Sequence, residues 1–204
     1  MEGTQSVKIT IPERLADISI GKYKKFIAMA TEDNTDEQAM FHFCGLTPDQ
    51  QQRMKASDRI EIRGKIANAL EEKPKLTQTF KLNGVEYGLH PKLEDISMGE
   101  YVDLDEYFKD PYHNATQVLG VLYRPITEKK YGKYLIENYD PDKHTGEAFN
   151  DLGVDIFFGC MLFFYRLEIA LHRTFLQSLP KDQLMNQLST SRASSQESGD
   201  GTQP

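Results

Sequence analysis

The sequence predicts an α+β fold that is mainly α-helical with small β-hairpin elements, and three observations lead to this prediction. The segment from Leu15 to Tyr23 returns as Leu93 to Tyr101, with six of nine positions identical. Asn83-Gly84 joins two short alternating segments, and a long apolar stretch runs from about Val154 to Leu179. Because an internal repeat in a sequence indicates repeated structural units, we expect two related β-to-helix units closed by a long, buried C-terminal helix.

The first unit begins with a predicted strand at Val7–Ile11, where apolar and β-branched residues alternate with polar ones. Ser19 is the expected cap of the following helix, since a serine oxygen accepts a hydrogen bond from a free backbone N–H. A helix over about 36–43 should end at a glycine. Thr47 and the proline after it predict another helix start, and a longer helix is expected over about 57–72.

The second unit begins with a predicted hairpin of 79–82 and 85–89, because Asn-Gly readily adopts the positive φ angles of a tight turn. Ser97 to Glu100 forms a capping box, which predicts a helix start at Ser97. A moderately apolar helix is expected from His113 to Tyr123. The segment Tyr131–Ile136 predicts an irregular loop or a short strand.

These elements predict a single compact domain over residues 1–180, made of repeat-like units at about 7–82 and 83–180. Residues 181–204 are rich in Ser and Gln with few apolar side chains. Such a segment buries too little apolar surface to offset its ordering entropy, so we expect a disordered tail.

The composition and charge of the chain disfavour several classes of protein. A formal net charge of −7 over 204 residues disfavours non-specific nucleic-acid binding. The uncharged, strongly apolar run Ile156–Tyr165 is far shorter than the roughly 20 residues of a membrane span. Cys44 and Cys160 lie in apolar helical stretches and are interpreted as reduced core thiols. No signal peptide is visible at the start, and we expect a soluble protein of the cytoplasm.

No pattern of residues indicates a reaction. The five histidines are scattered, and a zinc site built from His42 and Cys44 would lack a second pair of ligands. The acidic residues between Glu94 and Glu106 fit a solvated helix face better than a cation site. We therefore expect no enzyme activity, no metal and no cofactor.

Two features leave a structural and a functional interpretation open. Arg124, next to a proline at a predicted helix end, either has a structural role, capping carbonyls or pairing with a carboxylate across a unit interface, or contacts a partner. The aromatic residues of the last helix belong either to the core or to a docking surface. The candidate partner-binding residues are Arg124, Phe157, Phe158, Phe164 and Tyr165.

The order of segments over roughly residues 7–180 resembles a group of tailed-bacteriophage proteins encoded among the virion genes. The matching segments are Ile11–Ser19, Asn83–Gly88, Met98–Leu104, Val121–Ile126, Tyr134–Tyr139 and the Phe-Phe-containing last helix. The Leu-Tyr-Arg-Pro-Ile segment followed by the last helix is the most specific of them.

The resemblance implies a tail-assembly chaperone that holds the tape-measure protein through apolar helical surface until tail-tube subunits assemble around it. The alternative that it leaves open is a permanent virion component, such as a head–tail connector or ring subunit. The implied partners are phage tail or virion proteins, with a possible homo-oligomer. A chaperone would reside in the host cytoplasm, and a structural component in the virion.

Overall fold

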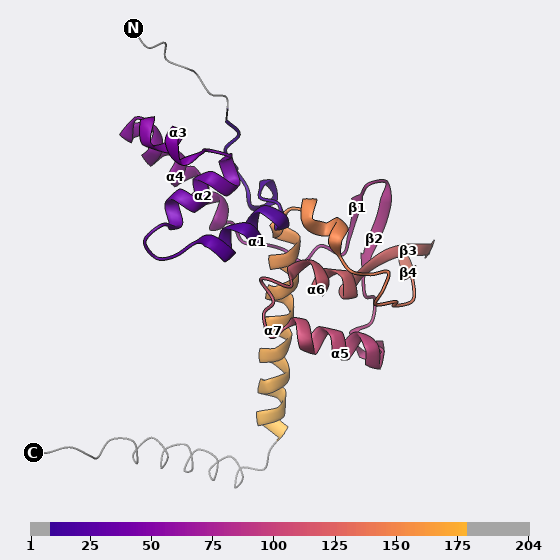
Figure 1. The fold of residues 1–204 in the computed structure, drawn as a ribbon. Helices are drawn as coiled ribbons and strands as arrows, with labels where there is room; N and C mark the ends of the chain where they lie inside the picture. The colour runs from indigo at the N-terminus through magenta and orange to yellow at the C-terminus, as the bar shows by residue number, and fades with distance from the viewer. Residues whose placement is uncertain (1–8, 179–204) are drawn as a thin grey trace, which may run out of the picture. The chain divides into compact units, whose positions relative to one another are not determined.

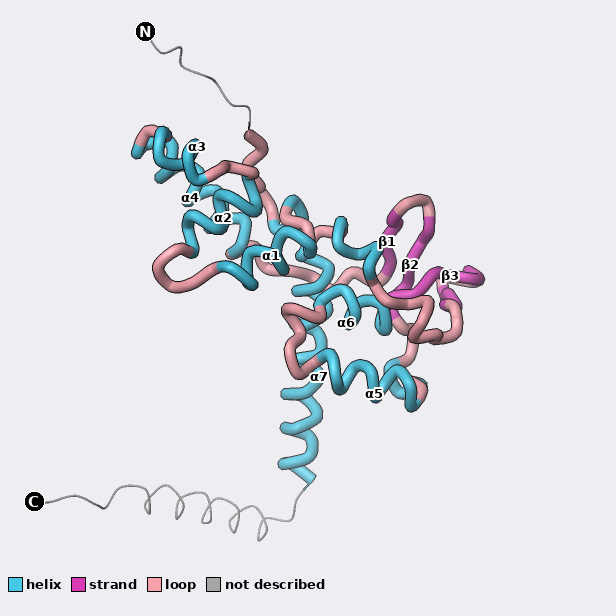
Figure 2. The backbone as a smooth tube through the Cα atoms, viewed as in Figure 1, coloured by secondary structure: helices cyan, strands magenta, loops and turns pink. Residues whose placement is uncertain are grey.

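The computed structural model describes residues 9–178 and shows an α+β fold, with seven α-helices and one four-stranded antiparallel sheet in that range (Figures 1 and 2). The helices are α1 (Ile20–Met29), α2 (Thr35–Cys44), α3 (Pro48–Arg53), α4 (Ala56–Leu70), α5 (Met98–Tyr107), α6 (Ala115–Leu122) and α7 (Val154–Ser178). The strands are β1 (Thr79–Leu82), β2 (Val85–Leu89), β3 (Tyr123–Lys130) and β4 (Lys133–Ile136).

The packing divides the chain into two units after Leu162, inside α7. The first unit holds α1 to α6, the sheet and the start of α7, and the second begins at Phe163. The predicted tail, 181–204, lies outside the described residues. No helix of the described range is both long and apolar enough to cross a bilayer.

The two copies of the repeat adopt the same local structure. In each copy a 3₁₀ turn, Leu15–Asp17 or Leu93–Asp95, precedes a serine-capped α-helix. The Ser19 hydroxyl accepts the N–H of Lys22, and the Ser97 hydroxyl accepts the N–H of Glu100, both at 3.3 Å. The two predicted caps are therefore confirmed.

The other helix signals near the N-terminus also match the structure. Thr47 and Gln50 form a capping box at the start of α3, with a proline in its first turn. Gly45 ends α2 with a φ of 74°, the left-handed conformation that glycine adopts without strain. Met40 and Phe43 of α2 are buried, as are apolar residues of α4, so these helices share a small core.

The sheet has the order β1-β2-β3-β4 with every pair antiparallel. The hairpin of β1 and β2 was predicted, whereas the predicted strand at Val7–Ile11 is wrong for its described part, since Ile9–Ile11 is not a strand. The predicted helix through Tyr123 instead ends at Leu122, and the chain continues directly into β3. Pro125, which cannot donate to a helix, is accommodated in this strand opposite Tyr87.

The core of the first unit centres on α6 and the start of α7. Every residue from Val118 to Tyr123 is buried, together with Phe157 and Cys160 of α7. Burial raises the pKa of the Cys160 thiol to about 12. The predicted buried C-terminal helix is thus observed over its first turns, whereas Tyr165 further along is exposed.

Candidate functional site

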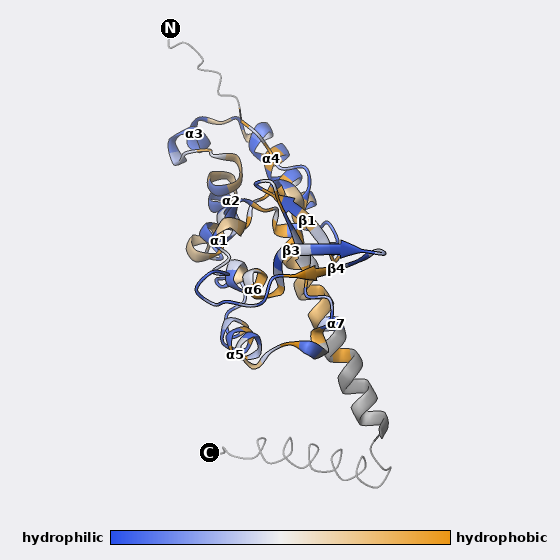
Figure 3. Cartoon of the chain, turned by 90° about the vertical axis from the view of Figure 1, so that its right-hand side faces the viewer, coloured by the Kyte–Doolittle hydropathy of each residue, from blue (hydrophilic) through white to orange (hydrophobic). Residues whose placement is uncertain are grey.

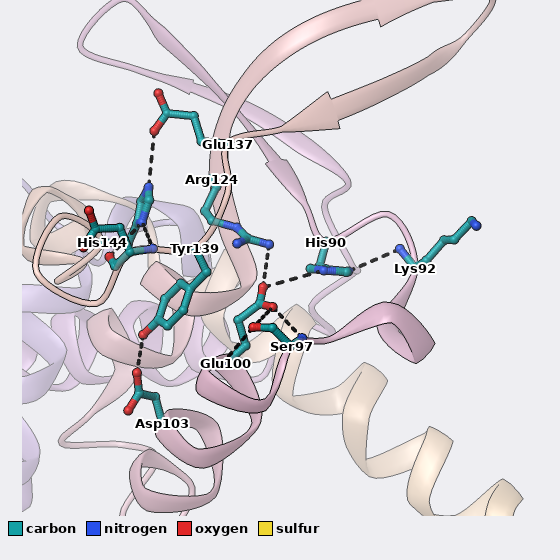
Figure 4. Close-up of polar contacts among 10 residues, drawn as sticks. His90, Lys92, Ser97, Glu100, Asp103, Arg124, Glu137, Tyr139 and His144 are labelled. Atoms are coloured by element: carbon teal, nitrogen blue, oxygen red, sulfur yellow. Dashed lines mark hydrogen bonds and ion pairs between the residues drawn. The ribbon is translucent and has the colours of Figure 1, made fainter.

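A buried ion pair joins the second copy of the repeat to the sheet. Glu100 lies in the first turn of α5, and Arg124 is the second residue of β3. Arg124 Nη2 lies 2.6 Å from Glu100 Oε1, and both side chains are about 5% exposed or less. Figure 4 shows the two side chains pointing toward each other from the helix and the strand.

The carboxylate of Glu100 is also held by the capping serine. The backbone N–H of Ser97 donates to Oε2 at 2.7 Å, and its hydroxyl donates to the same oxygen at 2.6 Å. Burial raises the pKa of Glu100, but the Ser97 hydrogen bonds and the Arg124 charge outweigh it, so the pKa lies below its ordinary value. Glu100 is therefore an ionised carboxylate with a buried counter-ion.

His90 lies beside this pair but does not supply the positive charge that balances Glu100. Its Nδ1 accepts the N–H of Lys92 at 3.3 Å, which assigns the ring proton to Nε2, 3.6 Å from Glu100 Oε1. Burial lowers the pKa of His90, and the neighbouring Arg124 lowers it further against the raising effect of Glu100. The ring is accordingly neutral at pH 7, and Arg124 supplies the positive charge.

A second contact ties α5 to the segment after β4. The Tyr139 hydroxyl donates to Asp103 Oδ2 at 2.5 Å, and the Arg124 guanidinium carbon lies 5.8 Å from the centre of the Tyr139 ring. Burial and the Asp103 carboxylate raise the pKa of this tyrosine, so its hydroxyl stays protonated. Tyr139 also stacks on His144, which contacts Glu137 through Nε2 at 3.3 Å.

These contacts fix which face of α5 is presented to solvent. Glu100 and Leu104 are buried on the inner face, whereas Met98, Tyr101 and Val102 are 76%, 62% and 55% exposed. Residues three and four apart share one face of a helix, so the exposed stripe of α5 continues from these three apolar residues to Asp105 and Glu106. We call these five residues the α5 stripe.

The α5 stripe has a covered counterpart in the first copy of the repeat. Ile20 matches Met98 and is fully buried, and the ring of Tyr23, which matches Tyr101, packs edge-on against Phe158 at 5.1 Å. The Ile20 N–H donates to Leu152 O at 2.8 Å, so an extended segment lies against the start of α1. The start of this helix face is thus covered in the first copy of the repeat and exposed in the second.

The hairpin of β3 and β4 is a second exposed feature. The short strand expected as one alternative within Tyr131–Ile136 is observed as β4, whereas the sequence did not predict β3 or its pairing with β4. Its turn residues, Tyr131 and Gly132, have φ angles of 51° and 74°, and Tyr131 is 92% exposed. Lys130 Nζ lies 5.5 Å from the centre of the Tyr131 ring. Lys129 and Lys133 flank the turn, and Figure 3 shows the hydrophilic end of β3 projecting from the sheet.

The structure separates the five residues predicted to bind a partner. Arg124 and Phe157 are buried, which favours the packing role for both. Phe158 is half-buried against Tyr23. Phe164 is half-buried with its ring 5.4 Å from Phe163, and Tyr165 is 61% exposed. Of the five, Tyr165 is thus the side chain best placed to meet a partner. The sequence alone did not identify the α5 stripe or the turn between β3 and β4 as exposed surfaces.

The described residues of the first unit line several hollows. A cavity of about 160 Å³ lies between the sheet and the segment from Glu137 to Phe149, lined partly by Tyr87, Tyr123 and His144. A wider depression, about 680 Å³, lies beside Tyr139 and Lys143. Among the described residues, no three His, Cys, Asp or Glu side chains gather closely enough to hold a metal ion.

Comparison of the chain with protein-family models, with curated proteins and with solved structures found no match in any of the three.

Proposed function

We propose that this protein is a phage assembly protein, a tail-assembly chaperone that binds the tape-measure protein through apolar helical surface. The proposal rests on the sequence resemblance described above, and one structural observation supports it. α7 continues for a further 16 residues, Phe163–Ser178, after the boundary of the first unit. This continuation begins Phe-Phe-Tyr, and the Tyr165 side chain is exposed.

A chaperone of this kind needs an apolar binding surface on a protein that is otherwise polar and whose copies repel one another through their net charge. The chain has a net charge of −7, which opposes its own non-specific association. Its continuing helix carries Leu167, Ile169, Leu171 and Phe175 in sequence. An apolar helix of this length can pair with another amphipathic helix through residues spaced three and four apart, and a tape-measure protein is expected to be largely helical.

The test is a pull-down from phage-infected cells with the full chain as bait, followed by mass spectrometry. The wild-type chain should recover the phage's long helical tape-measure protein. Tyr165→Ser should recover several-fold less, because it removes an exposed aromatic from the proposed binding helix. Ile60→Ser is the matched control, since it removes an exposed apolar side chain from α4, and it should recover the wild-type amount.

Two outcomes would contradict the proposal. One is recovery of portal, capsid or tube proteins in place of the tape-measure protein, which would favour the alternative of a connector or ring subunit. The other is an equal loss of the tape-measure protein with Tyr165→Ser and Ile60→Ser, which would show that α7 has no particular part in binding.

A further inference from the structure

The first unit carries two exposed surfaces of opposite character that its own core does not use. The α5 stripe combines Met98, Tyr101 and Val102 with the carboxylates of Asp105 and Glu106. In residues 105–110 the exposed charged side chains are the acidic Asp105, Glu106 and Asp110 and the single lysine Lys109, which pairs with Glu106. The hairpin turn, residues 127–133, contains three lysines and one glutamate around the exposed Tyr131.

The first copy of the repeat shows how such a helix face is covered. At α1 the cover is a piece of extended chain, Leu152–Val154, which exchanges backbone hydrogen bonds of 2.8 Å with Ile18 and Ile20. An aromatic ring, that of Phe158, lies over Tyr23. Met98 and Tyr101 of α5 are 76% and 62% exposed. No described segment of the first unit therefore covers them as Leu152–Val154 and Phe158 cover Ile20 and Tyr23 of α1.

The hairpin of β3 and β4 has the same kinds of groups, extended backbone and an aromatic ring, that cover the matching face of α1. It is extended chain that ends in an aromatic side chain, and Leu135 on β4 adds a further exposed apolar group. Lys130 and Lys133, next to Tyr131, are exposed. Tyr131 can pack on Met98, since a thioether sulfur packs favourably against an aromatic ring, while the lysines meet Asp105 and Glu106.

We propose that the hairpin turn of one copy of this protein docks on the α5 stripe of a second copy. Charge complementarity within one chain is the argument for a second copy as the occupant, because every copy carries both the basic turn and the acidic stripe. The two surfaces differ, so the contact is head-to-tail, and it leads to a closed ring or an open filament. This proposal does not depend on the function proposed above.

Analytical ultracentrifugation of the full chain over a range of concentrations, at low and at physiological salt, tests it. The wild-type chain should form species larger than a monomer, and added salt should weaken them because exposed charges are screened. Lys130→Glu with Lys133→Glu should weaken association at least tenfold. Asp105→Lys with Glu106→Lys should do the same.

The combined variant makes the test specific. All four reversals together place an acidic turn opposite a basic stripe, and association should return to within about threefold of the wild type. The control is Glu61→Lys with Lys65→Glu, which reverses an exposed pair on α4 and should leave association unchanged. A wild-type chain that stays monomeric throughout, or a combined variant that stays dissociated while its circular dichroism is native, would overturn the proposal.

Discussion

Replacing Arg124 with alanine should destabilise the fold chiefly by leaving Glu100 as a buried, unpaired charge. The two side chains are 4% and 5% exposed, and their closest nitrogen and oxygen are 2.6 Å apart. Removing one partner from a buried ion pair costs about 3–5 kcal/mol. Since the free energy of unfolding of a domain is roughly 5–15 kcal/mol, this loss is a large share of the total.

The loss should depend on pH in a particular direction. In the wild type the pKa of Glu100 is lowered, so its contribution is present above the ordinary carboxyl value and is lost as the pH falls through the folded value. In Arg124→Ala the burial of Glu100 is no longer balanced by the arginine, so its pKa should rise. The variant can then protonate Glu100 on mild acidification, and its deficit against the wild type should shrink.

Urea unfolding followed by circular dichroism at pH 7 and at about pH 4.5 measures both effects. Arg59→Ala is the control, because the Arg59–Glu37 pair is much more exposed, and it should cost only about 0–1 kcal/mol. The double variant Arg124→Met with Glu100→Gln should lose less than Arg124→Ala alone. A loss below about 1 kcal/mol at pH 7, or an equal loss at both pH values, would refute the reasoning.

Three further predictions concern packing, capping and reactivity. Gly88→Ala should cost about 1–3 kcal/mol in urea unfolding, because an added Cβ would lie 2.5 Å from the Tyr134 ring; an unchanged midpoint would show that this ring moves freely. Ser97→Ala should cost about 1–2 kcal/mol, more than Ser19→Ala, because only the Ser97 hydroxyl also donates to a buried carboxylate, that of Glu100; equal losses would contradict that role. The Cys160 thiol, whose pKa burial raises to about 12, should not react with a disulfide reagent at pH 8 until the chain is unfolded, and rapid labelling of the native Cys44→Ser variant, in which Cys160 is the one cysteine left, would contradict its burial.

The helix starts could be predicted from the sequence because their signals are local. A serine or threonine at the start of a helix accepts a hydrogen bond from a free backbone N–H of the first turn, and a glycine after the last turn adopts the left-handed conformation that ends the helix. Neither effect needs residues far away in the sequence. Ser19, Thr47 and Ser97 are therefore caps in the structure as predicted, and Gly45 ends α2. The Asn83-Gly84 hairpin is local in the same sense.

The rest of the sheet could not be predicted in this way. Most of β3 is charged or polar, and its turn is Tyr131-Gly132, which lacks the usual Asn or Asp. Its pairing with β2 joins residues far apart in the sequence, such as Gly88 and Arg124. Nothing near Arg124 in the chain indicates that its partner is Glu100.

The difference between the two copies of the repeat is likewise a tertiary effect. Ile20 and Met98 occupy the same position of the same local structure, yet only Ile20 is covered, by a segment more than 130 residues later in the chain. The one local hint is the exchange of Lys22 for Glu100, which lets the second copy complete its capping box and bind Arg124.

The measurement that tests the proposed assembly role most directly is the amount of this protein in infected cells compared with the amount in purified phage particles. Quantitative mass spectrometry against the tape-measure protein provides both ratios. A chaperone should be bound to the tape-measure protein in the cell and reduced to less than one copy per particle after purification. A fixed number of copies in every mature particle would contradict the chaperone role and identify a structural subunit.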